Sequence, residues 1–139
     1  MKEVLLYIWQ LPQNLVGLIL LGYYKLRKSL IKWTPITDTI IYLSKYMPSG
    51  ISLGNYIIFK DRTAYNRFPT PEDVRHEYGH HRQSLYLGPL YLLIIGLPSI
   101  LGNLWDRLFH RSWDWKESYK WYYNQPWEKW ADKLGGVQR

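Results

Sequence analysis

The stretch TPEDVRHEYGHHRQSLYLGP, residues 70–89, decides the fold because it contains both the signals of a long helix and the residues of a metal site. Thr70 is a favoured N-cap residue, Pro71 suits the first helical position, and acidic side chains suit the first turn of a helix. Gly88-Pro89 ends the pattern, since neither residue continues a helix well. We therefore expect a helix from about residue 71 to Gly88-Pro89.

Three of the four histidines lie in this helix. His76 and His80 are four positions apart, so both project from the same face, one turn apart, and can hold one metal ion. Glu77 is rotated by about 100° from His76, beside the open metal position, where it can accept a proton from a zinc-activated water. His81 points away from this face. The alternative interpretation is the polar face of an ordinary helix.

A catalytic zinc ion needs a third protein ligand, and with no cysteine in the chain that ligand is a histidine or a carboxylate. Glu128 is the best candidate, because Glu128 and Asp132 share one face of a short helix predicted from Pro126 to Gly135-Gly136. Glu128 could instead be a capping glutamate near the start of that helix. The other candidate third ligands are His110, Asp114 and Glu117.

The pairing of HEYGH with Glu128-Lys129-Trp130-Ala131-Asp132 resembles the gluzincin metallopeptidases, in which an HExxH helix is followed by an ExxxD helix. The resemblance implies a Zn²⁺ cofactor held by His76, His80 and Glu128. It further implies that Glu77 is the general base, that Asp132 hydrogen-bonds the outer nitrogen of a ligating histidine, and that the substrate is a peptide or protein.

Residues 51–60, ISLGNYIIFK, are rich in β-branched and aromatic side chains and are predicted to form one strand. In the gluzincins, an edge strand beside the active site binds extended substrate by adding it to the sheet. The resemblance implies the same role for Ile51 to Phe59. Tyr119, Tyr122 and Tyr123 are candidates for stabilising a reaction oxyanion, and Arg75 and Gln83 for orienting a substrate or a carboxylate.

Two apolar stretches, residues 4–24 and 85–105, are each about long enough to cross a bilayer. Gln10, Pro12, Gln13 and Asn14 interrupt the first, which is alternatively an amphipathic surface helix. The second carries no charge, but Gly88-Pro89 and Gly96-Leu97-Pro98 break it. A single crossing there would separate His80 from Glu128, so we expect either a re-entrant hairpin near Pro98 or a buried core segment.

The composition favours a membrane partner. Aromatic residues make up 17% of the chain, and Trp and Tyr suit a membrane interface. The net charge is +7, and the basic residues are dispersed among apolar runs, which favours anionic lipid over nucleic acid. The basic cluster after residue 24 predicts that the active site faces the cytoplasmic side. Its members are Lys25, Arg27, Lys28 and Lys32.

The 139 residues are therefore expected to form a single, mostly helical α+β domain. Its parts would be a zincin-like active-site helix, a short edge sheet and two apolar membrane-associated segments. The predicted function is that of a membrane-associated zinc metallopeptidase. The alternatives are a non-catalytic membrane protein whose His-Glu face binds a structural metal or a partner, and a peripheral lipid-binding module without a metal.

Overall fold

Helix α3 (Pro71–Leu87) lies at the centre of the computed structural model, which describes residues 1–34 and 40–139. The Thr70 hydroxyl accepts a hydrogen bond from the backbone N–H of Asp73 at 3.1 Å, and the Asp73 carboxylate accepts one from the backbone N–H of Thr70 at 3.0 Å. This reciprocal pair satisfies two N–H groups at the start of the helix. At the other end, Gly88 adopts a positive φ of 54°. The predicted helix is confirmed.

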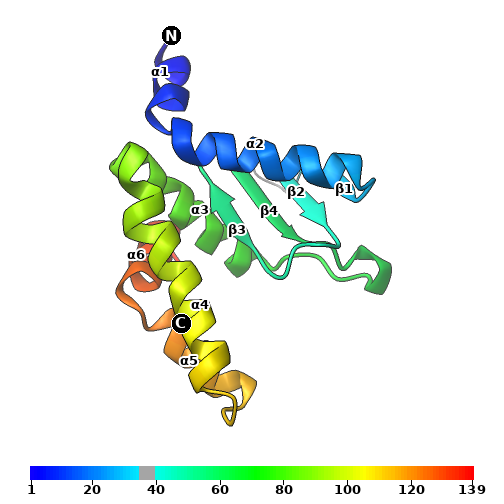
Figure 1. Ribbon diagram of the computed structural model, residues 1–139, viewed down its shortest axis with the longest axis vertical. Coiled ribbons are helices and arrows are strands. Elements are labelled where there is room, and N and C mark those ends of the chain that lie inside the picture. The colour runs from blue at the N-terminus through cyan, green and yellow to red at the C-terminus, as the bar shows by residue number, and fades with distance from the viewer. Residues whose placement is uncertain (35–39) are drawn as a thin grey trace.

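A four-stranded sheet packs beside this helix, so the expected α+β fold with a helical majority is confirmed. The strand order is β1-β2-β4-β3, in which β2 and β4 are parallel and the two outer pairs are antiparallel. The strands are β1 (Leu30–Trp33), β2 (Ile41–Ser44), β3 (Ile51–Leu53) and β4 (Tyr56–Lys60). Strand β3 lies at one edge of the sheet (Figure 1).

The prediction of one strand over residues 51–60 is wrong, because the segment folds back on itself at Gly54 and Asn55. Gly54 has a φ of +61°, a left-handed conformation that glycine adopts without steric strain. The backbone N–H of Asn55 donates to Asn14 Oδ1 at 2.8 Å. The run is therefore a tight hairpin in which Leu53 pairs with Tyr56.

Each face of the sheet packs against a helix. Ile58 points to α2 (Leu11–Leu26), where it joins Leu21 and Tyr24 in one buried cluster. Its neighbours Ile57 and Phe59 point to the opposite face, which Val74 of α3 partly covers. This alternation follows from the two-residue period of a strand, and each fully buried Ile or Leu contributes about 1.5–3 kcal/mol. The sheet thus holds α2 and α3 on opposite sides (Figure 1).

Residues 4–24 do not form one continuous apolar segment, so the expectation of two such segments needs correction. The chain forms α1 (Lys2–Trp9) and α2, bent by 83° at Gln10. The polar residues that interrupt the stretch are buried: Ser84 of α3 donates to Gln10 Oε1 at 2.7 Å and accepts from Gln13 Nε2 at 2.8 Å. Burial of these amides without such partners would cost several kcal/mol, so they fix the bend against α3.

The second apolar stretch forms a helix that runs from Leu92 to Phe109, and it is the one helix of the described residues long and apolar enough to cross a membrane. It begins as a π-helix, η3 (Leu92–Gly96), and continues as α4 (Leu97–Phe109). A proline removes one backbone hydrogen bond and crowds the preceding turn, and the wider π turn before Pro98 accommodates both effects. The chain does not reverse at Pro98, so the expected hairpin there is wrong.

The chain returns through α5 (Trp115–Tyr123) and α6 (Pro126–Gly135), and α6 packs closely on α3. The helix predicted from Pro126 to Gly135-Gly136 is confirmed. A Cβ atom on Gly79 would collide with the backbone carbonyl of Ala131, so only glycine permits this approach of the two helices. The helix pair brings the HEYGH segment of α3 against Glu128 and Asp132.

Candidate metal centre

His76, His80 and Glu128 converge in the interior, although 48 residues separate the second histidine from the glutamate. The Nε2 atoms of both histidines lie 3.1 Å from Glu128 Oε2, and all three side chains are buried. Adjacent ligands of a tetrahedral ion with bonds of 2.0–2.1 Å lie about 3.3 Å apart. The three donor atoms therefore have a spacing that suits one metal ion.

The outer nitrogens of both histidines donate hydrogen bonds to protein acceptors. His76 Nδ1 donates to Asp132 Oδ1, and His80 Nδ1 donates to Gln83 Oε1, each at 2.7 Å. Gln83 is itself oriented, because its Nε2 donates to the carbonyl of Trp127 at 2.8 Å. With a proton on each Nδ1, both Nε2 atoms keep a lone pair for a metal. Gln83 thus orients a histidine rather than a substrate or a carboxylate.

The electrostatics of the cluster favour a cation between the three side chains. Burial acts to lower the pKa of His76, but hydrogen bonds to Asp132 and Glu128 outweigh it and raise that pKa to about 9. Burial acts to raise the pKa of Glu128, and the two histidines hold it well below its usual range. A proton or a metal ion between the histidine Nε2 atoms and Glu128 Oε2 would offset the repulsion between their lone pairs.

Glu77 lies beside this cluster, and its side chain is also buried, but unlike Glu128 it has few hydrogen-bond partners. Its Oε2 atom has no hydrogen-bond partner among the described residues. Burial raises the pKa of the Glu77 carboxyl, although His80 and His76 act to lower it. Gly50, the residue immediately before β3, lies against the other oxygen, because a Cβ atom on Gly50 would lie 2.6 Å from Glu77 Oε1. A buried carboxylate oxygen without a partner, on a group whose pKa is raised, is free to accept a proton.

The second oxygen of Glu128 is held by the apolar helix. Ser99 Oγ of α4 donates to Glu128 Oε1 at 2.9 Å, which leaves Oε2 facing both histidines. Sequence reasoning missed this residue. The available signal was a small hydroxyl side chain within an apolar run, which is costly unless the hydroxyl is hydrogen-bonded.

Two of the candidate tyrosines border the cluster. The ring of Tyr123 lies edge-on to that of His76, with ring centroids 5.1 Å apart. Burial and the carboxylates of Glu77 and Glu128 raise the pKa of Tyr123, and burial and Glu128 raise that of Tyr122. Both phenols are therefore protonated and able to donate near neutral pH. Sequence reasoning missed a buried third tyrosine, Tyr91, whose hydroxyl donates to the carbonyl of Ser52 at 3.0 Å.

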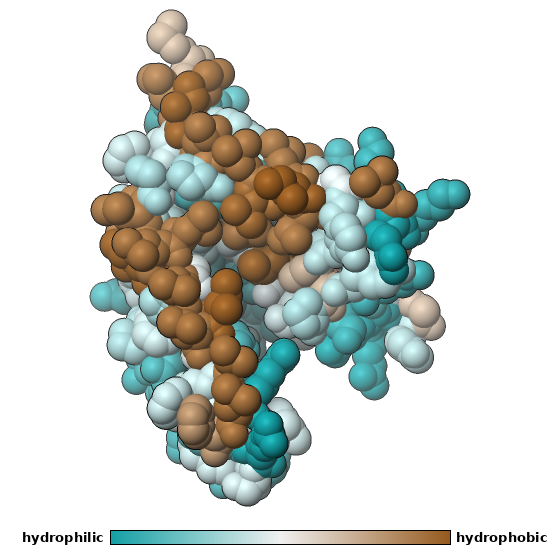
Figure 2. Space-filling view, in the orientation of Figure 1, coloured by the Kyte–Doolittle hydropathy of each residue, from teal (hydrophilic) through white to brown (hydrophobic). Residues whose placement is uncertain are grey.

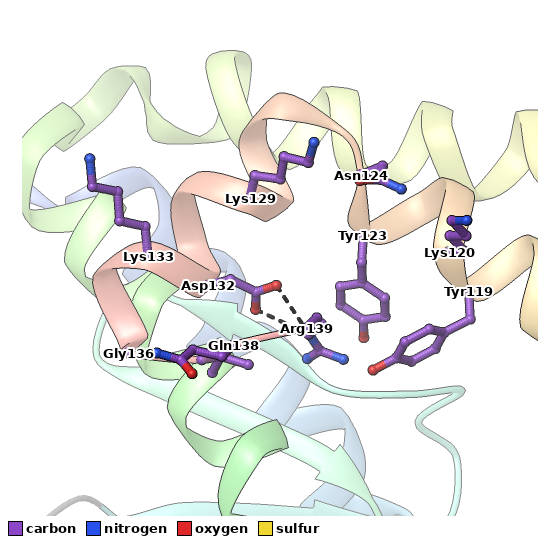
Figure 3. Close-up of a pocket in the computed structure, with 11 residues that line it drawn as sticks. Tyr119, Lys120, Tyr123, Asn124, Lys129, Asp132, Lys133, Gly136, Gln138 and Arg139 are labelled. Carbon is purple, nitrogen blue, oxygen red and sulfur yellow. Dashed lines mark hydrogen bonds and ion pairs between the residues drawn. The ribbon is translucent and has the colours of Figure 1, made fainter.

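A cavity of about 850 Å³ opens beside Asp132, between α5, α6 and the last four residues (Figure 3). Arg139 Nε lies 3.1 Å from Asp132 Oδ2, and its guanidinium lies 3.8 Å from the centre of the Tyr123 ring. The Tyr119 ring lies 5.2 Å from this guanidinium and beside the Tyr123 ring, with the two ring centroids 4.5 Å apart (Figure 3). The Asp132 carboxylate is therefore fixed between an imidazole and an arginine.

The other candidate ligands lie outside the cluster. His110 Nδ1 donates to Asp106 Oδ1 at 2.9 Å, while Asp114 and Glu117 form the capping box of α5. His81 points away from the His76–His80 pair, as expected, and its Nδ1 donates to the carbonyl of Gly54 at 2.7 Å. Arg75 is exposed.

Comparison with protein-family models, with curated proteins and with solved structures found no match for this chain.

Proposed function

We propose that this protein is a membrane-associated zinc metallopeptidase in which His76, His80 and Glu128 hold the metal. The observation that carries the proposal is the buried Oε2 atom of Glu77, which has no partner among the described residues, on a carboxyl that interacts electrostatically with the three converging ligand side chains. Three protein ligands leave one tetrahedral position open, an arrangement typical of catalytic zinc rather than of structural zinc.

The roles of the side chains follow from their positions. Zinc bound here would activate a water molecule and polarise the substrate carbonyl. Glu77 would accept a proton from the attacking water and return it to the leaving amine. Tyr123, whose pKa is raised by burial and by Glu77, would donate a hydrogen bond to the developing oxyanion. Asp132 and Gln83 would keep both imidazoles in the required tautomer.

A peptide substrate is supported by the resemblance to the gluzincins and by the place of β3. This strand is at the edge of the sheet, and Gly50 immediately before it lies against Glu77. An extended peptide that paired with this edge would run past the proton acceptor. The Tyr91 hydroxyl already donates to the carbonyl of Ser52. Such a peptide would therefore have to leave this carbonyl unpaired or break the Tyr91 hydrogen bond.

Membrane association is supported by the exposed apolar helix Leu92–Phe109 and by the cluster of basic residues that begins in the last turn of α2. All four, Lys25, Arg27, Lys28 and Lys32, are exposed. Basic residues beside an apolar segment favour the anionic cytoplasmic leaflet. We therefore propose that the site faces the cytoplasmic side.

The test is Glu77→Gln, measured by zinc content after purification and by hydrolysis of a peptide library. We expect near-stoichiometric zinc in wild type and in this variant, with turnover lost only in the variant. Glu72→Gln, at an exposed position of the same helix, is the matched control and should keep both. Equal hydrolysis by wild type and Glu77→Gln, or wild type without zinc after zinc is supplied, would exclude the proposed mechanism.

A structural metal site in a non-catalytic membrane protein is the second candidate, and the burial of all three ligands favours it. The same variants separate the two. A structural site would lose stability on removal of zinc, and Glu77→Gln would change neither zinc content nor any activity.

A further inference from the structure

Helix α4 carries an apolar stripe along one side that no other described residue covers. Its exposed residues follow the spacing i, i+3, i+4, i+7, i+8 and i+11, which places them on one face of a helix. They are 45% to 63% exposed: Leu97, Ile100, Leu101, Leu104, Trp105 and Leu108. Burying such a face would contribute several kcal/mol, so an exposed stripe of this length indicates a surface that contacts an apolar phase or a partner.

Helices α1 and α2 expose similar stripes on the same face of the molecule. The exposed residues include Val4, Ile8, Leu11, Leu15, Leu18 and Ile19. Figure 2 shows hydrophobic atoms in a continuous band over α1, α2 and α4, with hydrophilic side chains on either side. The two longer helices run in different directions across this face (Figure 1). The band is therefore a broad surface rather than a groove that fits one helix.

The charges beside the band favour a lipid bilayer as the occupant. Exposed basic residues lie at the ends of both long helices: Lys25, Arg27 and Lys28 at the end of α2, and Arg107 and Arg111 at the end of α4. Long basic side chains can extend from an apolar contact to lipid phosphates. Trp9 and Trp105, each about half exposed, suit the boundary between acyl chains and head groups.

The opposite side of α4 is too polar for this helix to cross the membrane. Ser99 projects about 180° from the centre of the stripe at about 100° per residue, and Asn103 also lies off the stripe. Helix α5 packs against α4 and carries exposed Lys116 and Lys120. A crossing by α4 would take this charged helix into the hydrocarbon, at a cost of about 2.5 kcal/mol or more for each charge.

We propose that α1, α2 and α4 together dock on one leaflet of an anionic membrane, with α4 in the membrane plane and not across it. The inference rests on the membrane association proposed above and defines its geometry. Because Ser99 projects away from the lipid side and holds Glu128, the metal centre lies about one helix diameter, 10–12 Å, from the lipid contact. Polypeptide segments at the membrane surface are then within its reach.

The absence of cysteine allows a direct test with two neighbouring positions of α4. Leu104 lies in the stripe and Asn103 does not, and both are exposed. Each single variant, Leu104→Cys and Asn103→Cys, is bound to vesicles of phosphatidylcholine and phosphatidylglycerol and treated with a membrane-impermeant maleimide. We expect rapid labelling of Asn103→Cys and labelling of Leu104→Cys slowed at least about tenfold, since an in-plane helix buries only its apolar face.

Two outcomes would overturn the proposal. Protection of both cysteines would mean that α4 crosses the bilayer, whereas rapid labelling of both on sedimented vesicles would mean that another surface makes the contact. Equal labelling of the two variants in urea verifies their intrinsic reactivity. The readout requires neither zinc nor hydrolysis, so failure of the proposed enzyme function leaves this test valid.

Discussion

The Nδ1 atom of His76 lies 2.7 Å from Oδ1 of Asp132, on the side of the imidazole ring opposite to Glu128. Arg139 contacts the same carboxylate from the cavity side. Asp132→Asn removes the charge that orients and polarises His76, so we expect zinc affinity to fall about 10- to 100-fold. Competition with a chelating dye measures this affinity.

Asp106→Asn is the matched control for this prediction. Asp106 accepts a hydrogen bond from His110 Nδ1 at 2.9 Å in the same manner, but the pair lies outside the metal cluster. Zinc affinity should not change in this variant. Equal affinities for wild type and Asp132→Asn would contradict the role assigned to Asp132.

Gly50 is expected to determine the position of Glu77. In Gly50→Ala the new Cβ atom would lie 2.6 Å from Glu77 Oε1 and 2.7 Å from the Phe59 ring, so the flexible carboxylate has to move. A displacement of about 1 Å at a reacting group lowers kcat about 100-fold, and zinc content should be unchanged. Gly96→Ala, where the new atom meets only ordinary contacts at 3.5 Å, is the control in the same hydrolysis assay. Unchanged kcat in Gly50→Ala would contradict the placement of Glu77.

Stabilisation by zinc should increase with pH. The pKa of His76 is raised to about 9 in the metal-free protein, so its protonation stabilises the fold fully below its unfolded pKa of about 6.5. This stabilisation is lost as the pH rises through about 9. Zinc must displace this proton, so its apparent affinity should rise up to about tenfold per pH unit over this window. Thermal unfolding with and without buffered zinc should show a larger increase in Tm at high pH, and a smaller one would contradict proton competition.

Close packing of α3 on α6 gives a prediction about folding. In Gly79→Ala the new Cβ atom would collide with the backbone carbonyl of Ala131, which has no flexible end that can move aside. We expect the free energy of unfolding to fall by about 1–3 kcal/mol or more. In Gly22→Ala no described atom lies within 4 Å, and we expect a gain of up to about 1 kcal/mol from helix propensity. Urea denaturation measures the free energy of unfolding of both variants. An equal change in Gly79→Ala and Gly22→Ala would contradict the close approach of α3 and α6.

The local features of the chain were predictable because they depend on spacing over a few residues. The Thr70 cap, the helix to Leu87, the shared face of His76 and His80, and the final helix after Pro126 all follow from backbone geometry within one or two turns. The turn at Gly54 was missed, since β-branched residues on both sides of it gave one uninterrupted strand signal.

Contacts across long separations were decided by packing. The sequence favoured Glu128 over His110, Asp114 and Glu117 as the third ligand, and the approach of α6 to α3 brings Glu128 to the two histidines. The roles of Ser99 and Gln83 appear only after α4 and α6 are in place, because their partners lie 29 and 44 residues away.

The sequence by itself determined which residues could bind a metal, because helical periodicity fixes the direction of neighbouring side chains. Only the tertiary structure decided which carboxylate faces them and which apolar residues remain uncovered. Residues 4–24 look like a membrane segment in composition, yet burial of Gln10 and Gln13 bends them against α3. Burial depends on the whole set of packed elements, so local composition does not reveal it.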